Sequence, residues 1–143
     1  MNGNLRQAEQ SPSLILCVVD FSESSGRAVE WAAQMAQTTH AHVTVLHTFR
    51  LIQFKNGEVF AMKKRKEEEA LIQFSAIENK LLYGKKISYD FKAEVGFITD
   101  RIESYASRNS ILFLVIDKSI CERNKESFEE LLKNIHIPLV IIP

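Results

Sequence analysis

Two aspartates each follow an apolar run, at positions where a carboxylate could do chemistry. Asp20 comes directly after the run 14–19, and Asp117 comes directly after the run 111–116. If both runs are neighbouring parallel strands, the two carboxylates meet at one edge of the sheet. Such a pair could act in general acid–base chemistry if the pKa values of its members were separated. Two solvated strand-end acids are the simpler interpretation, so the pair alone does not predict an enzyme.

Three histidines come close together in the sequence, but their pattern does not indicate a metal site. A metal site needs ligands that converge with carboxylate or thiol support, and the spacing of His40, His42 and His47 gives no sign of such convergence. His40 and His42 flank the expected turn between a helix and a strand, where exposure is the simplest interpretation. His47 ends its strand beside Asp20 and is placed to hydrogen-bond it.

Neither cysteine suggests a disulfide framework or a redox motif. Cys17 lies inside an apolar run and is expected to be a small buried hydrophobe. Cys121 is expected in a loop, where it could be exposed. Two cysteines without a Cys-x-x-Cys pair fit a reducing compartment. Residues 1–13 are mostly polar and lack the apolar centre of a secretory signal, so we expect a cytoplasmic protein.

The overall charge and the length of the apolar runs argue against two classes of partner. The chain of 143 residues carries 18 Lys and Arg against 18 Asp and Glu, so it offers no basic field to nucleic acid. The strongest charge run, residues 63–69, nearly cancels itself and is typical of a solvated helix face. The apolar runs are far too short to span a bilayer. We expect neither nucleic acid nor a membrane as a partner.

The apolar pattern alternates between strands and helices along the chain. Runs that are apolar on both faces predict buried parallel strands, and apolar residues three and four apart predict helices. The expected strands are 14–19, 42–47, 86–94, 111–116 and 138–142, and the expected helical faces are 28–36, 61–82, 98–105 and 128–135. After a flexible tail at residues 1–13, residues 14–143 should form one α/β domain. Its fold is a doubly wound five-stranded parallel sheet with helices on both faces.

In such sheets, ligands bind beyond the carboxyl ends of the strands, where the strand order reverses. This rule points to Asp20, to His47 and Thr48, and to Asp117. Between the second strand and the long helix, residues 51–60 hold an Asn-Gly pair between apolar flanks, which is typical of a hairpin. Such a hairpin could serve as a lid or a partner surface. An ordinary loop leading into the helix is the other interpretation.

Four short motifs occur in order along the chain. They are Val19–Ser24 after the first strand, Val45–Thr48 at the end of the second, Val95–Gly96 after the third, and Pro138–Ile142 in the closing strand. Together they resemble the motifs of the universal stress protein family, from residue 14 to the end of the chain. The resemblance implies an adenine nucleotide alpha-hydrolase-like fold with strand order 3-2-1-4-5.

Members of that family divide into ATP binders and non-binders. In the binders, an aspartate after the first strand lies near the adenosine, and backbone groups after the second strand hold adenine. A glycine-rich loop after the fourth strand wraps the ribose and the phosphates. By this resemblance, the candidate nucleotide-binding residues are Asp20, Phe21, Thr48, Ile116 and Asp117.

The segment after the fourth strand departs from the binder pattern. Residues 117–127 contain no glycine, and Asp117 and Ile120 stand where the family has its first two glycines. Residues 125–126 fall on the closing Gly-Ser position. Glycine lets backbone amides approach phosphate closely at positive φ, and nothing in the sequence fixes Arg123 into a substitute cradle. Losing two charge-assisted hydrogen bonds costs about 3–6 kcal/mol, which weakens micromolar binding to roughly millimolar or worse. We therefore predict no cofactor, and no tight binding of ATP by the usual family mode.

Three functions stay open on this basis. The preferred one is a non-catalytic regulatory or binding protein of the stress-response type, without tight ATP binding. The alternative is a binding module for an AMP-type adenosine nucleotide with a modified phosphate loop. The third, an enzyme of the adenine nucleotide hydrolase class, needs a phosphate loop that the sequence does not show.

The closing strand is expected at an edge of the sheet, where an apolar strand can pair with another chain. Its residues Leu139, Val140, Ile141 and Ile142 are the candidate interface of a homodimer. By the family resemblance, the two strands would run antiparallel across a twofold axis. A further protein partner of unknown kind also stays open.

Overall fold

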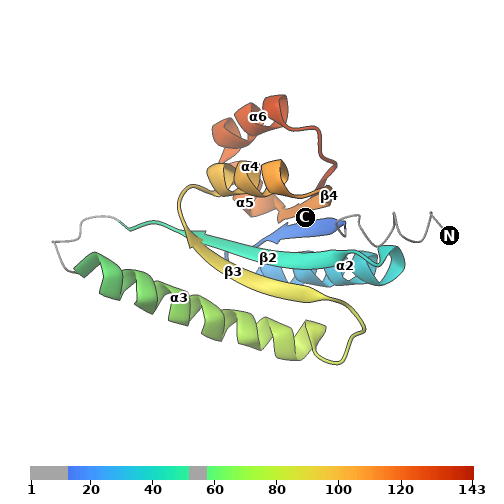
Figure 1. The fold of residues 1–143 in the computed structure, drawn as a ribbon, viewed down its shortest axis with the longest axis horizontal. Helices are drawn as coiled ribbons and strands as arrows, with labels where there is room; N and C mark the ends of the chain where they lie inside the picture. The colour runs from blue at the N-terminus through green and yellow to red at the C-terminus, as the bar shows by residue number, and fades with distance from the viewer. Residues whose placement is uncertain (1–12, 52–57) are drawn as a thin grey trace.

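A computed structural model describes residues 13–51 and 58–143 of the chain. Its centre is a five-stranded, all-parallel sheet with the order β3-β2-β1-β4-β5 (Figure 1). The strands are β1 (Leu14–Val18), β2 (His42–Phe49), β3 (Tyr89–Val95), β4 (Ile111–Asp117) and β5 (Leu139–Ile142). The predicted fold class and strand order are therefore confirmed.

Helices cover both faces of the sheet. They are α2 (Glu23–Thr39), α3 (Glu58–Ile77), which continues into the π-helical turn η1 (Glu78–Leu82), α4 (Ile98–Arg108), α5 (Lys118–Arg123) and α6 (Lys125–Asn134). Figure 1 shows α3 along β3 on one side of the sheet and α4, α5 and α6 on the other side. The apolar residues of α2 pack on the same face as those of α3.

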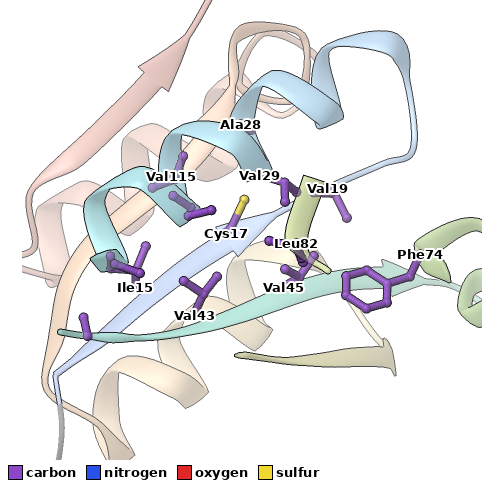
Figure 2. Close-up of a cluster of buried hydrophobic side chains, with 14 residues drawn as sticks. Ile15, Cys17, Val19, Ala28, Val29, Val43, Val45, Phe74, Leu82 and Val115 are labelled. Atoms are coloured by element: carbon purple, nitrogen blue, oxygen red, sulfur yellow. The ribbon is translucent and has the colours of Figure 1, made fainter. Parts of the chain in front are cut away.

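The alternation of side chains along β1 creates a separate core on each face. Ile15 and Cys17 pack with α2 and α3, whereas Leu14, Leu16 and Val18 pack with α4, α5 and α6. All five side chains are buried. Successive side chains in a strand point to opposite faces, so a central strand covered on both sides must be apolar throughout. Figure 2 shows the first core, with Ile15 and Cys17 beside Val43 and Val45 of β2.

Several details of the fold differ from the sequence expectations. The third strand begins at Tyr89 instead of residue 86, because its pairing with β2 begins where Tyr89 lies beside Val43. Cys121 lies in α5 and is half-buried, so its placement in an exposed loop was wrong. Glu58 already belongs to α3, so the second flank of the expected hairpin is helical. The rest of that hairpin, residues 52–57, lies outside the described residues.

Within residues 13–51 and 58–143, no helix combines the length and the apolar character needed to cross a membrane. The same part of the chain holds no group of three or more His, Cys, Asp or Glu side chains placed to bind a metal ion.

Candidate functional site

A cleft of about 270 Å³ opens beyond the carboxyl ends of β1 and β2. Its lining includes Asp20 after β1, Thr48 and Arg50 at the end of β2, Phe97 before α4, and Arg123 of α5. Gly96, with φ of 136°, turns the chain from β3 into α4 at the rim of the cleft. The cleft thus lies where the strand order reverses, the usual ligand position in an open parallel sheet.

Asp20 is held inside this cleft by groups of the protein itself. Its Oδ1 accepts hydrogen bonds from the Ser22 amide at 3.0 Å and the Ser25 hydroxyl at 3.1 Å. Its Oδ2 accepts a hydrogen bond from Arg123 Nη2, which also forms an ion pair with it. Partial burial raises the pKa of Asp20, but the bonds from Ser22, Arg123 and Ser25 outweigh it and lower the pKa to about 2. The carboxylate is therefore ionised and already paired at neutral pH.

Asp117 is completely buried and caps the first turn of α5. Its Oδ1 accepts hydrogen bonds from the Ile120 amide at 2.9 Å and the Ser119 hydroxyl at 2.6 Å. Its Oδ2 accepts a hydrogen bond from the Ser24 hydroxyl at 2.8 Å, with the Ser22 hydroxyl at 3.5 Å. The expectation of two solvated strand-end acids is wrong for this residue. Serines of the segment after β1 therefore link both aspartates into one polar network.

The cap on α5 determines what its amides can bind. Free amides at the N-terminus of a helix attract phosphate and other anions. Here the Ile120 amide, at the start of α5, donates to the carboxylate of Asp117 instead. The amide at the start of α5 is thus occupied by a carboxylate of the protein itself and is not free to hold a phosphate after β4.

The family follows from comparison with known proteins. The sequence model described as the universal stress protein family matches residues 13–119, which is most of the chain. The chain belongs to the universal stress protein family. Solved structures of this family share its fold, whereas no protein among those with curated descriptions matches it.

Three solved structures illustrate the shared fold of this universal stress protein. UspA from Lactobacillus plantarum has 15% sequence identity and a TM-score of 0.72, and the match covers 94% of this chain and 100% of that one. A family member from Burkholderia pseudomallei has 16% identity and a TM-score of 0.67, with 92% and 96% covered. A universal stress protein from Archaeoglobus fulgidus, solved in complex with dAMP, has 17% identity and a TM-score of 0.60, with 93% and 98% covered. At these identities the likeness concerns the fold.

The structure brings together only two of the five candidate nucleotide-binding residues of this universal stress protein. Asp20 and Thr48 line the cleft. Asp117 lies in the network below it, and Ile116 is fully buried in the core beneath α4, α5 and α6. Phe21, with φ of 62°, packs against the core between the sheet and α2 and α3.

His47 does not make the hydrogen bond that the sequence suggested. Its Nδ1 bonds the carbonyl oxygen of Val19 at 3.1 Å, and its ring lies 4.7 Å from that of Phe21. Burial lowers the pKa of His47, although the Val19 carbonyl and the Asp20 carboxylate offset part of this effect. The imidazole is therefore largely neutral at pH 7.

His42 is also more than an exposed residue at a turn. Its Nδ1 lies 2.6 Å from the Ser88 hydroxyl, and its Nε2 lies 2.9 Å from Asp90 Oδ1. Thr44 donates to the same carboxylate oxygen at 2.7 Å. These bonds tie the beginning of β2 to β3, at the end of the sheet opposite to the cleft.

Sequence reasoning missed Arg50 and Phe97 as cleft residues, and it left Arg123 without a partner. Arg50 lies two positions after Thr48, and Phe97 follows Gly96. The motifs that end in Thr48 and Gly96 therefore indicated the correct edge of the sheet. No sequence pattern links Arg123 to Asp20, because 103 positions separate them.

Proposed function

We propose that this universal stress protein is a non-catalytic regulatory or binding protein that does not hold ATP through a main-chain phosphate loop. One observation carries the proposal: the buried carboxylate of Asp117 accepts a hydrogen bond from the Ile120 amide at the start of α5. The same arrangement gives no support to an enzyme of the adenine nucleotide hydrolase class. We also propose a cytoplasmic location, in keeping with a chain whose two cysteines are both free.

The physical reason is competition between two anions for one place. A triphosphate after β4 would have to displace the Asp117 carboxylate from its amide and hydroxyl donors, or lie beside it. The first choice leaves a buried charge without partners, and the second brings like charges together. Both choices oppose binding at this position.

A titration with ATP tests this proposal. In a thermal-shift experiment with about 1 mM MgATP, we expect the Tm to rise by less than about 2 °C, because a millimolar Kd adds only about 0.4 kcal/mol. A Kd of about 10 μM would add about 2.7 kcal/mol and shift the Tm by about 10 °C. A shift of that size would contradict the proposal. Magnesium sulfate at equal ionic strength is the control for general salt effects.

A second function, binding of an AMP-type nucleotide, has one observation in its favour. The cleft of about 270 Å³ at Asp20 and Thr48 stays open although the place after β4 is filled. Pockets for drug-sized ligands span about 300–1,000 Å³, so this cleft suits a small ligand better than a triphosphate. The relative from Archaeoglobus fulgidus was solved with dAMP, which is a nucleotide of this smaller kind.

We further propose that the protein forms a homodimer through β5. This strand pairs with β4 on one side only and forms an edge of the sheet. Ile141, near its end, is 48% exposed. An apolar edge strand favours pairing with another chain.

Substituting Ile141→Glu should convert the dimer into a monomer, because it places a charge at the apolar contact. Light scattering at tens of micromolar measures the mass of both proteins. Leu132→Glu is the matched control, since Leu132 is 41% exposed but belongs to α6 and not to the edge strand. A wild-type monomer at that concentration would reject the interface.

A further inference from the structure

Arg50 is a cation in the cleft that no acid of the described residues neutralises. No carboxylate oxygen in residues 13–51 and 58–143 forms an ion pair with it. Its guanidinium lies over the ring of Phe97, 4.3 Å from the ring centre. This stacking restricts the side chain while leaving its N–H groups available. Arg50 is therefore positioned by Phe97 and has no carboxylate partner among the described residues, so it could pair with an anionic ligand.

Arg123 of α5 provides a second guanidinium in the lining of the cleft. One of its nitrogens, Nη2, bonds Asp20, and 60% of its side chain is exposed. A guanidinium has five N–H donors, so the bond to Asp20 leaves others for a ligand. The lining of the cleft thus holds two guanidiniums and one carboxylate, that of Asp20.

After β4, the main-chain amide at the start of α5 is not free to hold an anion. The Ile120 amide at the start of α5 is already bonded to Asp117. An anionic ligand gains nothing from this amide, and the guanidiniums of Arg50 and Arg123 are the charged donors that line the cleft. Guanidiniums suit phosphate oxygens because they can form two parallel, charge-assisted hydrogen bonds.

We propose that the cleft binds a phosphate monoester and that Arg50 and Arg123, rather than a main-chain loop, hold its phosphate. This inference rests on the proposed function, in which the position after β4 is closed to phosphate. The volume of about 270 Å³ admits a single phosphate group with a small organic part more readily than a triphosphate. Phe97 is a positioning residue, since it acts through Arg50.

Calorimetric titration of the full chain at low salt tests the proposal, with inorganic phosphate, AMP and adenosine as probes. We expect phosphate and AMP to bind and adenosine to bind at least ten-fold more weakly than AMP, because it lacks the charged group. Arg50→Gln should weaken AMP binding about 10–100-fold, the value of one charge-assisted hydrogen bond. Arg50→Lys should weaken it less, since the charge remains while the paired geometry is lost.

Arg65→Gln is the matched control, because Arg65 is an exposed arginine of α3 that does not line the cleft. It should leave the affinity for AMP unchanged. Equal binding of adenosine and AMP would overturn the phosphate site, and so would AMP binding that Arg50→Gln leaves intact. Absence of binding for all three probes up to about 10 mM, an affinity of only about 3 kcal/mol, would overturn it as well.

The failure of this inference can be told apart from the failure of the proposed function. If AMP, phosphate and ATP all fail to bind, the inference fails and the proposed function stands. If ATP binds at micromolar concentration and Arg50→Gln does not change its affinity, a main-chain phosphate site is present and both fail.

Discussion

Replacing Asp117 by alanine is expected to lower the free energy of unfolding by about 2–4 kcal/mol, because it removes a helix cap and leaves buried donors unpaired. The carboxylate accepts hydrogen bonds from the Ile120 amide and from the hydroxyls of Ser24 and Ser119. It is completely buried. At about 4 °C per kcal/mol for a chain of this size, the Tm should fall by about 8–15 °C. Thermal unfolding followed by circular dichroism measures the change.

Two variants separate the cap from the rest of the polar network. Ser119→Ala removes one hydroxyl but keeps the bond to the Ile120 amide, so we expect a loss of about 1 kcal/mol or less. Asp117→Asn keeps an acceptor for the Ile120 amide. Its loss in the free energy of unfolding should lie between those of Ser119→Ala and Asp117→Ala. If Asp117→Ala unfolded at the temperature of the wild type, the carboxylate would not be the structural anion described above, and the argument against ATP would lose its support.

Replacing Phe74 by alanine is expected to detach α3 from the sheet and to lower the free energy of unfolding by about 3–5 kcal/mol. Phe74 is 4% exposed, and its ring stacks on Phe91 of β3 at 4.5 Å between ring centres. Among the side chains of α3, only Ala70 and Phe74 are buried. Figure 2 shows Phe74 reaching from α3 into the core. Removing the larger of these two side chains should therefore loosen the contact between α3 and the sheet, while Leu82 of η1 remains buried in the same core.

Hydrogen exchange shows where the structure is lost. The amides of α3 should exchange faster in Phe74→Ala, while those of β1 and β4 keep most of their protection. Leu71→Ala is the control on the same helix, because Leu71 is 55% exposed and its truncation should change stability by less than about 0.5 kcal/mol. Equal effects of the two substitutions would show that α3 is not anchored through Phe74.

The elements that the sequence predicted best were those with a strong local pattern. The strands β1 and β4 are apolar on both faces, and the structure buries both between two layers of helices. The faces of α2, α4 and α6 followed from apolar residues at helical spacing, and most of those residues pack in the two cores, whereas Leu132 of α6 is exposed. The boundaries of β3 were less certain, because a partly exposed edge strand depends on where its neighbour begins.

The candidate site was predicted in position but not in content. Asp20 and Thr48 were expected at the carboxyl ends of the strands, and both line the cleft. The glycine-free segment after β4 was expected to bind phosphate poorly, but its helical form and its cap by Asp117 were not foreseen. A short helix of six residues carries too little periodicity to be recognised from its sequence.

The sequence by itself determined the order of the strands and of the longer helices along the chain, the apolar layers and the absence of glycine after β4, because each depends on neighbouring residues in the chain. Only the tertiary structure decided the roles of the charges. Ser24 reaches Asp117 across 93 positions, and Arg123 reaches Asp20 across 103. A carboxylate is a buried cap, a paired ion or a solvated acid according to which donors the fold brings beside it. The folding of the sheet places those donors, and the residues next to each aspartate in the sequence do not predict them.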